Sequence, residues 1–340
     1  MCTAITYQTK GFYFGRTLDY EHDFGQTVTV SPRKYPFSFD GENVSDDHYA
    51  IIGMARVENG YPLYFDAMNE KGLAMAGLNF VGNAAYGSKK SGKVNIPHYA
   101  FISWILSQCG SLRDAKRMLQ SVNLTGETFA DLPQAQLHWM IGDQSGSIVV
   151  ESMKSGLHIY DNPVGVLTNN PTFPEQLLQL GNYMNLTPEE PINRFSDRIQ
   201  LIPHSRGMGA MGLPGDLSSQ SRFVRAAFGK LNSFSGNGEA ESVNQCFHIL
   251  DTVKQIRGCC RLGDGGCEIT RYSACCSTAA MTYYYKTYEN QQITAVHMDH
   301  SDLNGTSLSC YPLRATAQFA EENNPAMRYI VKAPTNAKIF

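Results

Sequence analysis

The sequence predicts an α+β fold in which antiparallel sheets are covered on the outside by helices. Segments with strand character and segments with helix character come in groups along the chain, rather than in strict alternation. Short turns rich in glycine, asparagine and aspartate join neighbouring strand segments, whereas a parallel sheet needs long crossovers. With 42% hydrophobic residues, the 340-residue chain is able to bury a large core. These patterns do not say how many sheets form.

The first residues are expected to form a β-hairpin. Residues 2–7 are rich in β-branched and aromatic types, residues 8–11 contain turn formers, and residues 12–16 again have strand character. When the chain folds back about Thr9 and Lys10, Cys2 lies opposite position 17 or 18. Arg16 and Asp19 therefore arrive beside Cys2.

The remaining elements follow from local patterns. Pro97 suits the first position of a helix that Gly110 stops, and Ser111 with Asp114 three residues later starts a second helix. The segment 203–220 is a long loop rich in glycine and methionine, and such a loop in a compact domain is usually functional or disordered. Further helices are expected at 174–184, 221–231 and 240–253. Strands are expected at 27–31, 49–54, 63–68, 73–80, 268–276, 281–288 and 293–298, with a four-strand meander at 136–141, 147–151, 157–160 and 164–168.

Composition argues against several classes of protein. The net charge of −3 is not that of a nucleic-acid-binding protein, which usually has a basic surface. The chain has no apolar run of about 18 residues, as a membrane span would need, and its first residues lack the pattern of a signal peptide. The nine cysteines are an odd number and include two adjacent pairs, which favours reduced thiols and a cytoplasmic location.

Cys2 is chemically special because it follows the initiator methionine. If Met1 is removed, Cys2 carries both a thiol and a free α-amine, so one residue holds a nucleophile and a base. An arginine beside the thiol favours the thiolate, and a carboxylate beside the amine holds it as an ammonium group. The residues alone leave an alternative open, in which Cys2 is an ordinary strand cysteine and Arg16 and Asp19 form a surface ion pair.

A series of short motifs resembles the choloylglycine hydrolase family, which are N-terminal nucleophile hydrolases that include bile salt hydrolases and penicillin V acylases. Each motif is weak by itself, but the set occurs in order over nearly the whole chain and is specific. The matching segments are Met1-Cys2-Thr3 and residues 15–19, 69–73, 76–80, 137–140, 165–169, 212–216, 221–225, 283–285 and 288–290.

The resemblance implies a four-layer αββα sandwich of two stacked antiparallel sheets, formed by residues 1–340 as a single domain that assembles into a homotetramer. It implies that Met1 is removed, that Cys2 attacks the amide of a conjugated bile salt, and that no metal or cofactor takes part. The other catalytic roles that it implies are an α-amine held by Asp19, an oxyanion stabilised by Asn79 and Asn169, and a thiol tuned by Arg16 and Arg222.

Asn79 favours bile salts, because bile salt hydrolases tend to carry asparagine at this position and penicillin V acylases tyrosine. A penicillin V acylase remains the alternative within the family. By themselves, Asn79 and Asn169-Asn170-Pro171 are turn signals, and Arg222 with Arg225 is a pair typical of a surface helix. The acyl pocket should be apolar, and the residues expected to line it are Leu18, Phe24, Tyr61, Phe65, Phe129 and Leu132.

The cysteines at 259–276 suggest a different class of function, a non-catalytic thiol or metal-binding protein. Zinc sites usually repeat a pair of cysteines separated by two residues, but here the pairs are adjacent. Adjacent cysteines in a strand point to opposite faces, so we expect free thiols and no metal. His138 lies in a predicted strand, where packing and hydrogen bonding are a better explanation than catalysis. A Cys–His hydrolase that uses another cysteine is a weak further alternative.

Overall fold

The computed structural model describes residues 1–39, 42–43, 48–263 and 265–323, and the N-terminal hairpin lies in a six-stranded antiparallel sheet. Hairpin strands β1 and β2 have neighbouring strands on both edges, and nearly all their residues are buried, so both faces are covered. In spatial order the strands are β14 (Val166–Leu167), β1 (Cys2–Gln8), β2 (Phe12–Tyr20), β15 (Ile269–Ser277), β16 (Thr282–Thr287) and β17 (Thr294–His297).

The second sheet has eight antiparallel strands and faces the first. Its middle strands are mostly buried: β8 is rich in small residues and is buried up to Asn79, and β6 is buried over its first five residues. In spatial order the strands are β13 (Gly156–Asp161), β12 (Gly146–Met153), β11 (Leu137–Asp143), β8 (Ala74–Asn79), β7 (Tyr61–Asn69), β6 (Ile51–Glu58), β3 (Thr27–Ser31) and β18 (Ser309–Pro312). Two short pairs lie outside the main sheets, β4 (Ser38–Phe39) with β5 (Glu42–Asn43) and β9 (Val94–Pro97) with β10 (Val122–Thr125).

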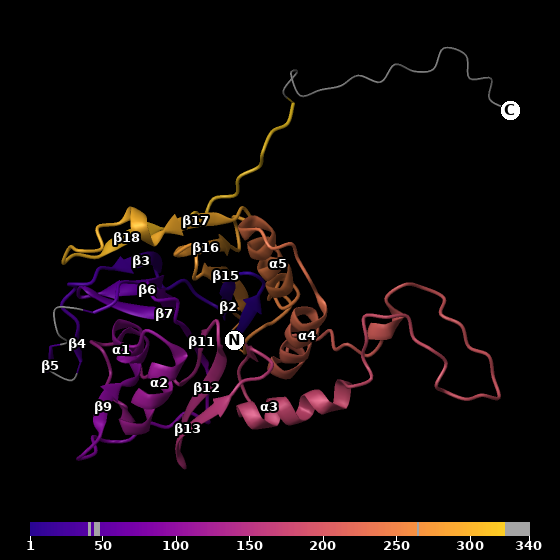
Figure 1. The fold of residues 1–340 in the computed structure, drawn as a ribbon, viewed down its shortest axis with the longest axis horizontal. Coiled ribbons are helices and arrows are strands. Elements are labelled where there is room, and N and C mark those ends of the chain that lie inside the picture. The colour runs from indigo at the N-terminus through magenta and orange to yellow at the C-terminus, as the bar shows by residue number, and fades with distance from the viewer. Residues whose placement is uncertain (40–41, 44–47, 264, 324–340) are drawn as a thin grey trace.

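Helices cover the outer face of each sheet (Figure 1). Helices α1 (Phe101–Gln108) and α2 (Leu112–Met118) pack on the eight-stranded sheet, and α4 (Ser219–Asn232) and α5 (Glu239–Asp251) pack on the six-stranded sheet. One buried cluster fills the space between the sheets and reaches α4 and α5, and a second lies between the eight-stranded sheet and α1. The predicted four-layer αββα sandwich is therefore confirmed.

Three boundaries differ from the prediction for local reasons. The first helix begins at Phe101 rather than at Pro97, because Pro97 ends β9 and a 3-10 turn, η1 (His98–Ala100), comes between. The second helix ends at Met118 and turns through η2 (Leu119–Ser121), so Val122 starts β10, which pairs with β9 in parallel. The helix predicted from Pro174 is α3 (Phe173–Leu180), where Thr172 and Glu175 form a capping box.

The predicted four-strand meander is wrong in its last strand. β14 is only two residues long and pairs with β1, in the other sheet. Gly165 at φ 65° turns the chain at this point, and the Asn162 side chain holds the turn by accepting from the Gly165 amide at 2.7 Å. The chain therefore crosses from one sheet to the other just before Asn169. The edge strand β18 is not predicted at all.

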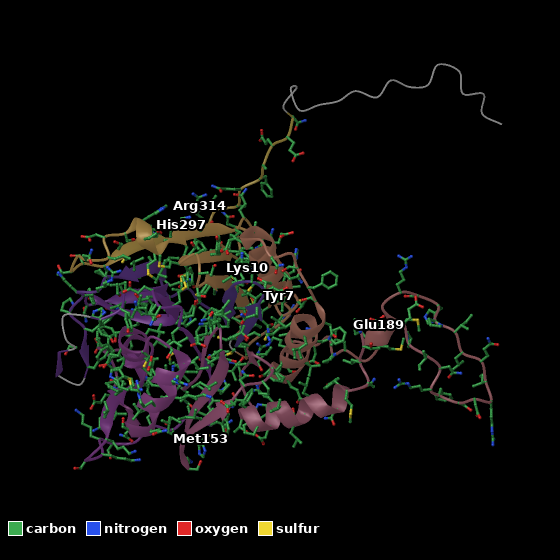
Figure 2. All side chains as sticks on the ribbon, viewed as in Figure 1. Tyr7, Lys10, Met153, Glu189, His297 and Arg314 are labelled. Carbon is green, nitrogen blue, oxygen red and sulfur yellow. The ribbon has the colours of Figure 1, made fainter. Side chains whose placement is uncertain are left out.

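A long excursion connects α3 to α4 and begins earlier than the loop predicted at 203–220. After η3 (Gly181–Tyr183), its only regular element among the described residues is η4 (Met208–Ala210). The excursion projects away from the two sheets and their helices, and Glu189 lies on it (Figure 1 and Figure 2). It exposes the large apolar side chains Met184, Ile192, Phe195, Ile199, Leu201, Ile202 and Met211. None of the described helices is both long and apolar enough to span a bilayer.

Candidate active site

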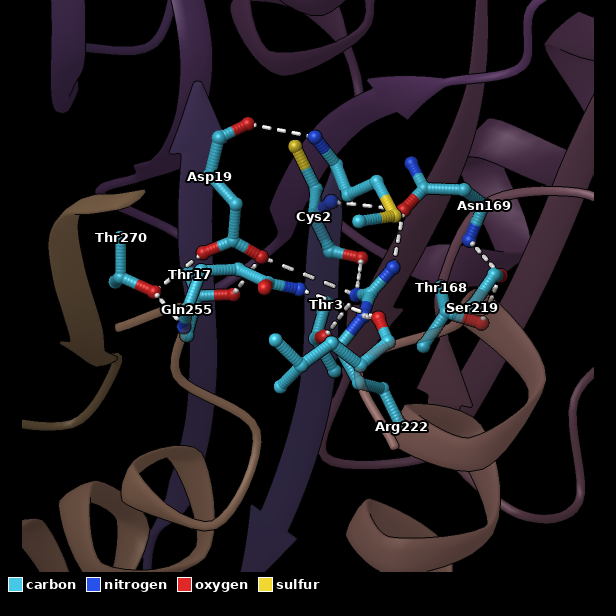
Figure 3. A network of polar contacts seen from close by, with 12 residues as sticks. Cys2, Thr3, Thr17, Asp19, Thr168, Asn169, Ser219, Arg222, Gln255 and Thr270 are labelled. Atoms are coloured by element: carbon cyan, nitrogen blue, oxygen red, sulfur yellow. Dashed lines mark hydrogen bonds and ion pairs between the residues drawn. The ribbon is translucent and has the colours of Figure 1, made fainter. Parts of the chain in front are cut away.

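The hairpin register places the candidate residues on two faces of one sheet. Cys2 pairs with Leu18 and Thr3 pairs with Thr17, which confirms the predicted register. Because side chains alternate along a strand, Cys2, Arg16 and Leu18 share one face, and Thr3, Thr17 and Asp19 share the other. The first face looks toward the eight-stranded sheet, and the second toward α4. Figure 3 shows the second group together with Cys2.

On the inner face, Arg16 holds the sulfur of Cys2. The Arg16 Nη2 atom donates to Cys2 Sγ at 2.9 Å, and both side chains are buried. Burial by itself would lower the pKa of Arg16, but the surrounding groups, including the Asp66 carboxylate, outweigh burial and raise it. The arginine therefore stays charged beside the thiol, and a thiolate is the form that such a cation stabilises.

On the other face, Arg222 and Asp19 surround the backbone of Cys2. Arg222 Nη1 donates to the Cys2 carbonyl oxygen at 2.6 Å and to Thr3 Oγ1 at 2.7 Å, and lies 3.9 Å from Asp19 Oδ2. Asp19 Oδ1 accepts from Thr270 Oγ1 at 2.6 Å. Both charged side chains are fully buried, so their mutual pairing offsets part of the cost of removing them from water.

Asn169 joins the two parts of the network. Its Oδ1 atom accepts from the Cys2 backbone nitrogen at 2.8 Å and from Arg222 Nη2 at 2.7 Å. Its Nδ2 atom donates to the Asn79 carbonyl oxygen at 2.8 Å. The two donors fix the orientation of the amide, so Nδ2 points toward the end of β8, where Asn79 lies beside Cys2.

Met1 occupies the space next to Cys2 on the side of Asp19. Its ammonium group donates to the Asp19 carbonyl oxygen at 2.7 Å and pairs with the buried carboxylate of Glu268. Burial lowers the pKa of this ammonium group. While Met1 is attached, the Cys2 nitrogen is an amide nitrogen without basicity. Removal of Met1 would turn this nitrogen into a free α-amine, already in contact with Asn169 Oδ1.

A cavity of about 340 Å³ opens beside Cys2 between the sheets and α1. Five of the six residues expected in the acyl pocket line it, namely Leu18, Phe24, Phe65, Phe129 and Leu132. The exception is Tyr61, which lies behind the cavity wall, where its ring packs against Phe129 with 5.2 Å between centroids. Arg56 and His98 are polar members of the lining, and burial lowers the pKa of His98 to about 4, so this imidazole is neutral near pH 7.

The cysteines outside the site are free thiols, with Cys275 and Cys276 buried in β15 and Cys259 exposed. Within the described part of the chain, no group of three histidine, cysteine, aspartate or glutamate side chains is arranged to hold a metal ion. His138 is packed, as expected: its ring stacks on Phe80, and its nitrogens contact Glu151 and the Thr168 carbonyl.

Sequence reasoning missed several polar residues that contact the predicted ones, among them Thr3, Thr270 and Asp66. Of these three, Thr3 alone has a local signal, because it follows Cys2 directly. Thr270, on β15, contacts Asp19 although 251 positions separate them. Asp66, on β7, lies 3.5 Å from Arg16 Nη1 across the space between the sheets. Contacts between distant strands leave no pattern in a single sequence.

Comparison with known proteins gives matches over most of the chain. Residues 2–311 match the family model described as linear amide C–N hydrolases, choloylglycine hydrolase family. A bile salt hydrolase/transferase of Lactiplantibacillus plantarum is 52% identical over 95% of this chain and 100% of its own. A protein of the same name from Clostridium perfringens is 36% identical, with the same coverage of 95% and 100%.

Solved structures agree with the sequence matches. A mutant of the conjugated bile acid hydrolase from Clostridium perfringens superimposes with a TM-score of 0.87 at 34% identity, covering 95% of this chain and 100% of the other. A penicillin V acylase from Agrobacterium tumefaciens has a TM-score of 0.70 at 20% identity, covering 93% of this chain and 94% of the other, which shows a common fold.

Proposed function

Because the chain belongs to the choloylglycine hydrolase family of linear amide C–N hydrolases, we propose that it hydrolyses the amide bond of glycine- or taurine-conjugated bile acids. The observation that carries this proposal is the position of Cys2. Its sulfur accepts a hydrogen bond from a buried arginine, and the same residue lines an apolar cavity suited to a steroid acyl group. The names of the full-length relatives support the same substrate.

The reaction begins at the mature N-terminus. The α-amine of Cys2 takes the thiol proton, and the thiolate attacks the carbonyl carbon of the scissile amide. Arg16 Nη2, at 2.9 Å from the sulfur, stabilises its negative charge. The resulting ammonium group is held by the Asp19 carboxylate and by Asn169 Oδ1, the present partner of this nitrogen.

Two asparagines are proposed to stabilise the tetrahedral oxyanion. Both residues lie beside Cys2, and the Asn169 Nδ2 atom is 2.8 Å from the Asn79 carbonyl oxygen. When the intermediate collapses, the C–N bond breaks and the α-ammonium group gives its proton to the leaving glycine or taurine nitrogen. The acyl group stays on sulfur as a thioester. Water then attacks this thioester and gives a proton to the α-amine, the C–S bond breaks to release the free bile acid, and the proton from the water passes to sulfur.

The test is a comparison of three substrates on purified mature protein. Glycine conjugate, taurine conjugate and penicillin V are incubated separately, and the released amine is quantified. Release from either bile salt at a kcat/KM well above that for penicillin V supports the proposal. Preferential release from penicillin V would make the chain a penicillin V acylase, the alternative that the shared fold leaves open. Stoichiometric zinc on reduced, inactive protein would favour the thiol or metal-binding alternative.

A transferase reaction would use the same thioester. The names of two full-length relatives include transferase activity, and an amine that attacks the thioester in place of water forms a new amide. The Cys2 thiolate is the leaving group whether water or an amine attacks, so the same residues would catalyse hydrolysis and transfer. Adding a neutral amine to the assay and identifying the new conjugate by mass spectrometry tests this extension, and hydrolysis alone at every amine concentration would contradict it.

Maturation follows from the proposed role of the α-amine. We propose that Met1 is removed, since the nitrogen of Cys2 is otherwise an amide. The intact mass of the active protein should be one methionine residue short of the translated sequence. An active enzyme that retains Met1 would contradict the mechanism.

We also propose that this domain works as a cytoplasmic homotetramer. Nine free cysteines fit a reducing compartment. The excursion between α3 and α4 supports association, because it carries exposed apolar side chains, with Phe195 84% exposed, away from the body. Light scattering on the purified protein measures the mass of the assembly, and a monomer would contradict the proposal.

A further inference from the structure

We infer that Asp66 is a positioning residue for this reaction, which holds the guanidinium group of Arg16 against the thiol of Cys2. The inference rests on the proposed function to the extent that Cys2 is the nucleophile. Asp66 lies on β7 in the eight-stranded sheet, on the face that looks at the hairpin, and is 1% exposed. It does not contact the cavity beside Cys2, so any effect on the reaction passes through Arg16.

The guanidinium group of Arg16 is held between the two sheets. Its Nη2 atom donates to Cys2 Sγ at 2.9 Å. Its Nη1 atom lies 3.5 Å from Asp66 Oδ1 and donates to the Phe65 carbonyl oxygen at 3.0 Å. The sulfur and the carboxylate therefore occupy opposite arms of one rigid, planar group. A guanidinium group fixed at one arm has a fixed direction at the other.

Two tyrosines hold the carboxylate itself. Tyr272 donates its hydroxyl to Asp66 Oδ1 at 2.5 Å, and Tyr283 donates to Oδ2 at 2.6 Å. Both tyrosines are fully buried on neighbouring strands of the six-stranded sheet. Burial raises the pKa of Asp66 above its ordinary value, and Arg16 and the two hydroxyls oppose this rise only in part. A buried carboxylate needs this many donors to remain charged.

Asp66 also completes the charge balance of the site. Two buried arginine–carboxylate pairs lie next to Cys2, Arg16 with Asp66 and Arg222 with Asp19, and the charges of each pair sum to zero. Proton transfer from the thiol to the α-amine moves charge without changing the balance of these two pairs. Without Asp66, the dry interior would carry one uncompensated positive charge, which is costly.

The test uses Asp66→Asn, which keeps the volume of the side chain but removes its charge and replaces one of its two acceptor oxygens by an N–H donor. Alkylation of Cys2 by iodoacetamide is followed on the N-terminal peptide by mass spectrometry, and kcat and KM are measured on a glycine conjugate. We expect Cys2 alkylation at pH 7 and kcat both to fall by about 100-fold, as for a misplaced catalytic group, with KM changed less than threefold. A shift in the pH of half-maximal alkylation should accompany this loss.

A pair of tyrosine variants provides the control and protects the test against misfolding. Tyr283→Phe removes one donor from Asp66 and is expected to slow alkylation and kcat by about fivefold to tenfold, the cost of one hydrogen bond. Tyr285→Phe makes the same change two residues along β16, where the hydroxyl accepts from the Arg314 amide at 3.1 Å, and should leave both rates unchanged.

Two results would overturn the inference. Folded Asp66→Asn with both rates within twofold of the parent would do so, as would Tyr283→Phe behaving like Tyr285→Phe. Alkylation needs no substrate, so failure of the proposed function is separable. If the parent cleaves no bile salt but the alkylation differences hold, the proposed substrate is wrong and the role of Asp66 stands.

Discussion

Substitution of Asn169 by aspartate separates its two roles, because aspartate keeps the acceptor and removes the donor. In Asn169→Asp, one carboxylate oxygen still accepts from the Cys2 nitrogen and from Arg222 Nη2. The Arg222 Nη2 atom, at 2.7 Å, then pairs with a charged carboxylate instead of a neutral amide. The other oxygen replaces Nδ2 at 2.8 Å from the Asn79 carbonyl oxygen. Two acceptors then face each other where an oxyanion is expected to form.

The magnitude follows from the contacts that change. Loss of one oxyanion donor costs on the order of 10²–10³ in rate, or about 3–4 kcal/mol in the barrier. The folded state loses one hydrogen bond and gains a stronger pair with Arg222, so the stability change should stay within about 2 kcal/mol. Asn169→Ala instead removes the partner of the buried Cys2 nitrogen, of the buried Arg222 Nη2 atom and of the half-buried Asn79 carbonyl, and should cost about 3–5 kcal/mol in unfolding free energy.

The assay is kcat/KM on a glycine conjugate, with unfolding free energy from chemical denaturation. The expected order of activity is parent, then Asn169→Asp, then Asn169→Ala, with only the alanine variant clearly destabilised. If Asn169→Asp keeps kcat/KM within threefold of the parent, Nδ2 does not serve the oxyanion. The side chain would then only hold the Cys2 nitrogen and Arg222.

Three further predictions concern the nucleophile, the choice of substrate and pH. Cys2→Ala should abolish amine release in a protein that still folds, whereas Cys276→Ala should keep turnover and lower the melting temperature; a dead Cys276→Ala that folds normally would contradict this. Asn79→Tyr should reduce bile salt turnover but spare penicillin V, and unchanged bile salt turnover would make Asn79 a turn residue. His98 is neutral when folded, with a pKa of about 4, but binds a proton near pH 6.5 when unfolded, so stability should fall by about 3 kcal/mol between pH 6.5 and 4. Denaturation of His98→Gln should lack this component.

The sequence predicts the hairpin and its register well, because both depend on local chemistry. The β-branched and aromatic content of residues 2–7, the turn formers after them and the strand character of 12–16 are short-range signals, and β1 and β2 pair as they indicate. The stacking of two sheets, and the roles of Asn79, Asn169 and Arg222, come from family resemblance instead. Turn residues and a helical arginine have no distinctive pattern of their own.

The features that the sequence does not predict are those that depend on contacts between segments far apart in the chain. β14 joins the six-stranded sheet because Gly165 and Asn162 redirect the chain, although its residues have the same character as the preceding meander. Tyr61 has an aromatic side chain of the kind that lines an apolar pocket, but its ring packs behind Phe129. In a single sequence, an apolar residue that lines a cavity is indistinguishable from one layer deeper in the core.

The alternation along β2 separates what can be varied from what cannot. Leu18 and Tyr20 reach the cavity, whereas Thr17 and Asp19 lie on the opposite face with the proposed proton-transfer groups. A mutant library confined to positions 18 and 20 would therefore explore new acyl groups while the amine chemistry stays intact. A shift of one residue in the register of β2 would exchange the two faces and destroy both. The substrate range in this scaffold is therefore expected to change through substitutions on the cavity face of β2, while the turn at residues 8–11 keeps the register of the hairpin.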